Sequence, residues 1–114
     1  MSWTRILPTG DVKNVSQSGV KFYHDLLDEL KKHDIIPIVT LYHWDHPQVL
    51  EETLGGWLNE SMATAFADYA RFVFQEFGSK IKIFTTFNEV NLYCMVGYGT
   101  GSWAPGKFFP NFLL

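Results

Sequence analysis

Cysteine is almost absent from this 114-residue sequence, which holds only Cys94. A single cysteine cannot form an internal disulfide, and no spaced Cys and His companions of a zinc site accompany it. We therefore expect neither a disulfide framework nor a structural metal, and no cofactor.

Basic residues and long apolar runs are also scarce. Nine Lys and Arg are dispersed among twelve Asp and Glu, for a net charge of −3. That balance gives no electrostatic footprint for nucleic acid or anionic lipid. No apolar run approaches the roughly 20 residues of a membrane helix, and the start of the chain lacks the basic and apolar regions of a signal peptide. We expect no nucleic-acid or membrane partner.

The residues that are present have a globular composition, with 46% hydrophobic and 17% aromatic side chains. Two N-x-S/T motifs, at Asn14 and Asn59, suit a glycosylated secreted protein. Because the chain contains five Asn, such motifs arise easily by chance. The compartment and the oligomeric state therefore stay open.

The spacing of apolar residues predicts strands that alternate with helices. Ser16 is a candidate N-cap, Gly55 and Gly56 stop a short helix, and Gly78 is a candidate left-handed C-cap. The predicted helices are about 17–34, 47–52, 59–77 and 90–96, and the predicted strands are 3–7, 35–42 and 81–87, with a loop over 97–106.

This order predicts an α/β fold with a parallel sheet, either an open doubly wound sheet or a βα barrel. No glycine-rich phosphate loop follows a strand, since the cluster Gly97, Gly99 and Gly101 follows a helical segment. Polar and aromatic residues instead follow the strands directly. In a barrel, that is the catalytic face.

Glu89 is the leading candidate for chemistry. A carboxylate at the carboxyl end of an apolar strand lies at a barrel mouth, where partial desolvation suits a general acid. The alternative is that Glu89 only occupies the first turn of the following helix, where a negative charge is favourable. Both interpretations stay open from position alone.

Three further residues could bind a hydroxylated ligand. Asn88 offers an amide that both donates and accepts hydrogen bonds, and His43 and Trp44 end the second predicted strand with an imidazole and an apolar ring face. Their ordinary roles are helix capping for Asn88 and core packing for His43 and Trp44. A metal site at His43, Asp45 and His46 is disfavoured because no third ligand of the usual kind is near; we expect Asp45 to cap the turn at Pro47.

Six motifs follow one another along the chain: SWTRILPTG, VTLYHWDHPQ, GGWLNES, FADYARFVFQEFG, TFNEV and GYGTGSWAPG. In this order and spacing they closely resemble one continuous region of glycoside hydrolase family 1, the β-glucosidases and their relatives. The resemblance implies a (β/α)₈ TIM barrel, of which residues 1–114 look like the second strand through the loop after the fourth. The resemblance also implies that residues 1–114 are part of one catalytic domain. Met1 then corresponds to an internal Met of that domain, as expected for an incomplete gene model or transcript.

The resemblance also implies roles for individual residues. Glu89 in TFNEV matches the acid/base, Asn88 the amide that contacts the sugar 2-hydroxyl, and His43 and Trp44 the glycone-binding pair. Val90 departs from the family, which usually has Pro there, and we expect only a small effect on stability.

The implied activity is that of a retaining β-glycosidase acting on small β-glycosides. Such enzymes need a second carboxylate as nucleophile, which in the family lies on a strand far downstream. We therefore expect this chain to be inactive by itself. The alternatives are a non-catalytic sugar-binding or signalling relative, and a thioglucosidase, although Glu rather than Gln at position 89 argues against the plant myrosinase type.

Overall fold

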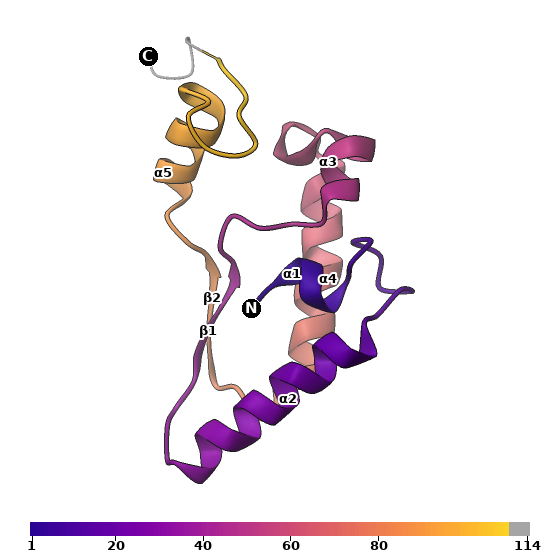
Figure 1. The fold of residues 1–114 in the computed structure, drawn as a ribbon, viewed down its shortest axis with the longest axis vertical. Helices are drawn as coiled ribbons and strands as arrows, with labels where there is room; N and C mark the ends of the chain where they lie inside the picture. Colours follow the sequence, from indigo (N-terminus) through magenta and orange to yellow (C-terminus); the bar gives the residue numbers. More distant parts are fainter. Residues whose placement is uncertain (110–114) are drawn as a thin grey trace.

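The computed structural model describes residues 1–109, which form an elongated α/β unit of 49 × 29 × 19 Å (Figure 1). Two parallel strands lie side by side, and two long helices pack beside them. The elements are α1 (Trp3–Ile6), α2 (Gln17–Lys32), β1 (Ile38–Tyr42), α3 (Gln48–Leu54), the 3₁₀ turn η1 (Gly56–Leu58), α4 (Ser61–Phe77), β2 (Ile83–Phe87), α5 (Val90–Cys94) and the π-helical turn η2 (Met95–Gly99).

The predicted strand over 3–7 is wrong, because Trp3–Ile6 is the short helix α1. The hydroxyl of Ser2 accepts a hydrogen bond from the Arg5 N–H and caps the helix. Trp3 and Ile6, three residues apart, are both fully buried, and the Trp3 ring stacks on Tyr69 of α4 at 4.9 Å. Packing on α4 therefore decides the conformation of an apolar run too short to show a period.

The predicted helix after Ser16 is confirmed as α2, with the Ser16 hydroxyl accepting from the Gly19 N–H at 3.2 Å. The predicted strand over 35–42 is shorter, since β1 begins at Ile38. The Ile35 N–H instead bonds back to the Leu30 carbonyl, and Asp34 takes a left-handed φ of 56°. Ile35, predicted to be in the strand, instead belongs to the turn that ends α2.

Both glycine stops work, by different means. Gly55 has a φ of 82° and ends α3 as a left-handed cap, as predicted. The left-handed cap predicted at Gly78 is wrong, because Gly78 has a φ of −60°. A Cβ there would lie 2.4 Å from the Phe74 carbonyl oxygen, so close approach, and not a positive φ, requires glycine.

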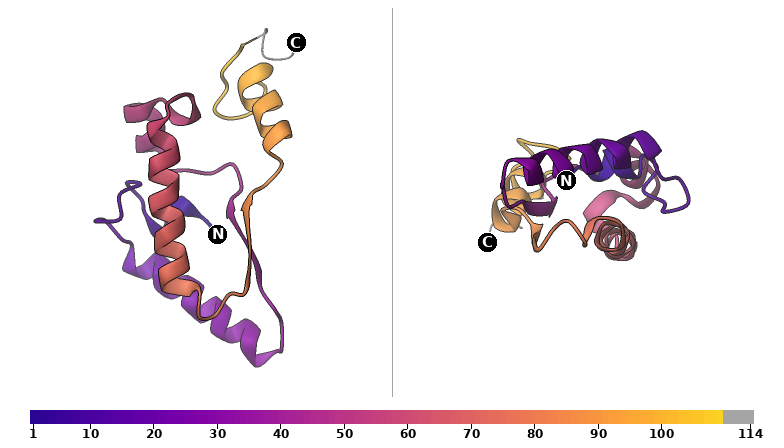
Figure 2. Two further views of the ribbon diagram at one scale, coloured as in Figure 1. Left: turned by 180° about the vertical axis from the view of Figure 1, so that it is seen from behind. Right: turned by 90° about the horizontal axis from the view of Figure 1, so that it is seen from below.

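The predicted parallel pairing is confirmed for β1 and β2, with Ile38 opposite Ile83 and Tyr42 opposite Phe87. The face that carries Val39 and Phe84 packs toward the helices, where Phe84 meets Phe74 of α4 at 4.9 Å. The other face carries Ile38 and Ile83, which are 66% and 46% exposed. Figures 1 and 2 show β1 and β2 as two adjacent ribbons, with α4 to one side of them and α2 near their lower end.

α2 is joined to the C-terminal part of α4 and the residues after it by packing and by two polar contacts. His24 of α2 contacts Glu76 of α4 at 2.8 Å, and Asp28 contacts Lys80 at 2.7 Å. Tyr23 packs edge-on against Phe77. Within residues 1–109, no helix is long and apolar enough to cross a bilayer.

The open sheet face predicts how the chain behaves when it is made alone. Exposed apolar strands without an opposite wall favour self-association. We expect the purified 114-residue chain to form oligomers or aggregates and to lack a sharp thermal transition, as measured by sedimentation velocity and circular dichroism.

A matched pair of variants tests the cause. Ile38→Lys charges the open face and should reduce association, whereas Val39→Lys charges the helix-facing side and should not. A monomeric wild-type chain that melts cooperatively would contradict the account.

Candidate active site

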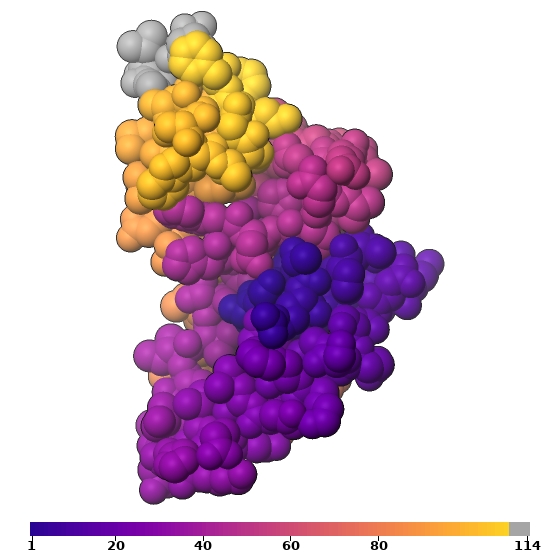
Figure 3. Space-filling view, in the orientation of Figure 1, coloured from indigo at the N-terminus to yellow at the C-terminus, as the bar shows by residue number. Residues whose placement is uncertain are grey.

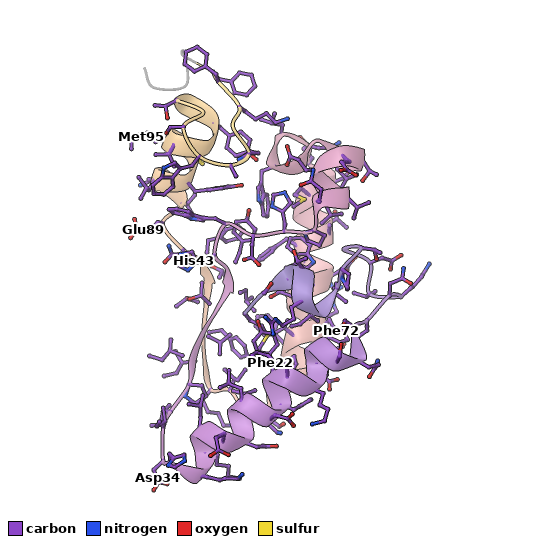
Figure 4. All side chains as sticks on the ribbon, viewed as in Figure 1. Phe22, Asp34, His43, Phe72, Glu89 and Met95 are labelled. Carbon is purple, nitrogen blue, oxygen red and sulfur yellow. The ribbon has the colours of Figure 1, made fainter. Side chains whose placement is uncertain are left out.

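Both strands end in a residue with a left-handed backbone. Beyond β1 lie His43 and then Trp44, whose φ is 70°, and beyond β2 lie Asn88 and then Glu89, whose φ is 45°. Because the strands are parallel and Tyr42 pairs with Phe87, the two ends meet at one edge of the sheet. Figure 4 shows His43 and Glu89 at this edge, at the opposite end of β1 from Asp34.

Asn88 is hydrogen-bonded to Tyr42, the last residue of β1, and to the two residues that follow it. Its backbone N–H donates to the Tyr42 carbonyl at 2.9 Å, and its own carbonyl accepts from the Trp44 indole N–H at 2.8 Å. The side-chain amide lies 3.1 Å from His43 Nε2. An amide nitrogen only donates, so His43 Nε2 is the acceptor in this contact. The two strand ends are therefore held in one fixed relation.

Glu89 is exposed and directly precedes α5. Its carbonyl accepts the Tyr93 N–H at 2.9 Å, but its side chain makes no capping bond. Within residues 1–109 the Glu89 carboxylate has no hydrogen-bond or ion-pair partner. The Asn88 side chain thus bonds to His43 and does not cap α5, whereas Glu89 occupies the N-cap position of α5 without a side-chain capping bond. Val90 is the first residue of α5, the helix position that suits the Pro usual in the family.

Trp44 lies between aromatic rings from the far end of the chain. Its ring stacks on Tyr93 of α5 at 5.8 Å with an interplanar angle of 24°, and it meets Trp103 at 5.3 Å. Trp44 therefore lies at the candidate site and also packs against other aromatic side chains, so this geometry is consistent with both roles considered for it.

A cavity of about 440 Å³ lies beside Trp44, between α3 and the segment 101–106. Tyr93 and Trp103 contribute aromatic walls, and Glu51 contributes a carboxylate. Figure 3 shows the yellow C-terminal segment lying against the magenta surface around α3. A second cavity, of about 490 Å³, is lined by Leu27, Ile35 and Lys80 at the other end of the strands and is remote from the candidate residues.

Glu51 of α3 turns its side chain toward the rest of the fold. Its side chain is 17% exposed, and its two oxygens lie 3.3 Å from His46 Nε2 and 3.2 Å from Lys107 Nζ. The pair joins α3 to the segment that follows η2. Sequence offers little signal for it, because Lys107 lies far along the chain.

Asp45 does not cap the turn at Pro47, which corrects an expectation from the sequence. The Asp45 carboxylate accepts a hydrogen bond from the Ser2 hydroxyl at 2.8 Å, and α3 has no side-chain cap. Within the described part of the chain, no group of three His, Cys, Asp or Glu side chains is placed to hold a metal ion. His46 is instead used in hydrogen bonds.

Beneath the site, the Tyr42 hydroxyl joins four side chains. It accepts from the Trp57 indole N–H at 2.9 Å, lies 2.9 Å from His46 Nδ1 and donates to the Tyr93 hydroxyl at 3.2 Å. Burial raises the pKa of Tyr42 to about 12 and raises the pKa of Tyr93 further. Both phenols therefore stay protonated near neutral pH and act as fixed dipoles under the strand ends.

The profile of glycosyl hydrolase family 1 matches residues 1–112. The chain belongs to glycosyl hydrolase family 1. β-Glucosidase 24 of Arabidopsis thaliana is 52% identical over 111 residues, which are 96% of this chain and 21% of that protein. This family 1 chain therefore spans about a fifth of the length of the curated relatives it matches.

Solved family 1 structures have the same fold over this region. The rice Os3BGlu6 β-glucosidase, as a Glu-to-Gln mutant in a covalent complex with Glc, superimposes with a TM-score of 0.91 at 42% identity, covering 94% of this chain and 22% of the rice chain. An aphid myrosinase gives 0.88 at 44% identity, covering 93% and 22%. The predicted partial TIM barrel is thus confirmed.

The Tyr42 network predicts a measurable contribution to stability. The test protein is a chimera in which this chain replaces the matching segment of β-glucosidase 24. Tyr42→Phe leaves the Trp57 N–H and His46 Nδ1 without their partner, so we expect a loss of about 1–3 kcal/mol in unfolding free energy. Tyr93→Phe removes only the acceptor at the end of the network and should cost less. Equal losses in urea denaturation would contradict this network.

Proposed function

We propose that the complete protein is a retaining, β-glucosidase-like β-glycosidase that hydrolyses O-glycosyl bonds, with Glu89 as its acid/base. One observation carries the proposal. The Glu89 carboxylate is unpartnered within residues 1–109 and projects from the edge where two parallel strands end. It directly follows Asn88, which is hydrogen-bonded to the last residue of β1 and the two residues after it. That edge is where the TIM barrel carries its catalytic residues.

The proposed chemistry has two steps. Glu89 first protonates the glycosidic oxygen as the aglycone leaves, while a second carboxylate attacks the anomeric carbon. Glu89 then removes a proton from the water that releases the sugar. The covalent complex with Glc in the similar rice enzyme supports the covalent intermediate.

Asn88 and His43 are proposed as ligands of the sugar hydroxyls. The Asn88 amide donates to His43, which leaves its oxygen free to accept from a hydroxyl. Trp44 contributes its ring to the same edge of the sheet. The substrate is a small β-glycoside, and this proposal requires no cofactor.

We also propose that residues 1–114 belong to one catalytic domain and supply only one of its two carboxylates. The family's nucleophile lies on a later strand, so this chain alone should not hydrolyse glycosides. A Glu at the end of the corresponding later strand of the complete protein would support the enzyme, and its replacement would favour the sugar-binding relative.

A thioglucosidase is the second candidate, favoured by the similarity to an aphid myrosinase. A thiolate leaves with little help from a general acid, whereas an alkoxide needs it. Comparing S- and O-glucosides as substrates of the chimera separates the two activities.

The acid role of Glu89 predicts a dependence on the leaving group. In the chimera, Glu89→Gln should lower kcat/KM on alkyl or disaccharide β-glucosides by about 10²- to 10⁴-fold, because those leaving groups need a proton. Activated aryl glucosides should lose less in the glycosylation step. Equal rates for the variant and the parent on a disaccharide would refute the role.

The binding role of His43 predicts a loss that leaving groups do not change. His43→Ala leaves Asn88 and a sugar hydroxyl without a partner, so the transition state should lose about 1–3 kcal/mol, measured from kcat/KM. His33→Ala, at an exposed end of α2, is the matched control and should have no effect. An unchanged kcat/KM for His43→Ala would make His43 a packing residue.

A further inference from the structure

The indole N–H of Trp44 donates to the Asn88 carbonyl at 2.8 Å. That carbonyl belongs to the peptide group that joins Asn88 to Glu89. An indole has one N–H and no acceptor, so this hydrogen bond uses the only polar atom of the Trp44 side chain. The side chain expected to bind sugar is bonded to the backbone of the acid/base candidate.

The peptide group that Trp44 contacts controls where Glu89 points. Rotation about the Glu89 N–Cα bond sets φ, which is 45°, in the left-handed region that residues other than glycine adopt rarely. Such a backbone persists only where its surroundings impose it. The Asn88 N–H is held by the Tyr42 carbonyl and the Asn88 carbonyl by the Trp44 indole, so the peptide groups before and after Asn88 are each held by one hydrogen bond.

Trp44 is itself well placed to act as a rigid donor. It also has a left-handed backbone, with a φ of 70°. Its ring stacks on Tyr93, whose N–H bonds to the Glu89 carbonyl, so the Trp44 ring, Tyr93 and Glu89 form a closed loop of contacts. Trp103 packs on the Trp44 ring as well. These contacts keep the indole N–H aimed at the Asn88 carbonyl.

We propose that Trp44 is a positioning residue that sets the direction of the Glu89 carboxylate through the Asn88 carbonyl, and that its indole N–H does not bind the sugar. This inference rests on the proposed function of Glu89. The two roles differ in a measurable way. A sugar ligand stabilises the transition state whatever the leaving group is, whereas a residue that aims the acid matters most when the leaving group needs a proton.

The experiment uses the chimera and a series of aryl β-glucosides from 2,4-dinitrophenyl to phenyl. Trp44→Phe retains an aromatic ring but has no N–H, and benzothienylalanine at position 44 replaces only the N–H by sulfur. We expect both variants to lose about tenfold or more in kcat/KM on the phenyl glucoside and much less on the dinitrophenyl glucoside. Azide, a nucleophile that needs no general base, should restore turnover of the dinitrophenyl glucoside.

Trp57→Phe is the matched control, because it also removes an indole N–H, the one that donates to the Tyr42 hydroxyl. It should change kcat/KM by the same factor across the series. A uniform loss in the Trp44 variants, or no loss, would overturn the positioning role. An unmodified chimera that folds but hydrolyses no glucoside would contradict the proposed function instead.

A crystal structure of the Trp44→Phe chimera gives a test that does not depend on activity. The Asn88–Glu89 peptide should rotate, with the φ of Glu89 leaving the left-handed region or the segment taking more than one conformation. A Glu89 backbone that is unchanged in the variant would overturn the inference.

Discussion

The three hydrogen bonds of Asn88 are the constraint on which the site depends. They join the backbone N–H, the carbonyl and the side-chain amide of Asn88 to Tyr42, His43 and Trp44, so each polar group of one residue at the end of β2 is held by the end of β1. Any change in the pairing of the two strands would break all three together. Glu89 is the next residue, so these hydrogen bonds also fix the position of its backbone.

The rest of the described chain supports that constraint. Tyr42 is held from below by the Trp57 N–H, His46 and Tyr93, and the Glu51 contacts with His46 and Lys107 extend this support to the segment after η2. The buried phenols add hydrogen-bonding groups that do not ionise near neutral pH. These contacts make the carboxyl end of the two-stranded sheet rigid.

Sequence reasoning found the parts of this arrangement that follow from periodicity. The long helices and the parallel strands follow from apolar spacing, and parallel strands necessarily bring His43, Asn88 and Glu89 to one edge. It missed α1, because Trp3 and Ile6 become helical through packing on α4. It also missed the Trp44 bond and the Glu51 contacts, since these depend on a left-handed turn and on partners distant in the chain. Periodicity is local, and these features are not.

The central claim is that the ends of β1 and β2 form the sugar-binding edge of a glycosidase, with Glu89 beside the reacting atom. The most direct measurement is a crystal structure of the chimera with deoxynojirimycin, an iminosugar in which a ring nitrogen replaces the ring oxygen of glucose. The account predicts His43 and Asn88 within hydrogen-bond distance of its hydroxyls, the Glu89 carboxylate facing its anomeric side, and the Trp44 N–H still bonded to the Asn88 carbonyl. An iminosugar bound away from this edge, or a Glu89 side chain turned away from it, would contradict the account.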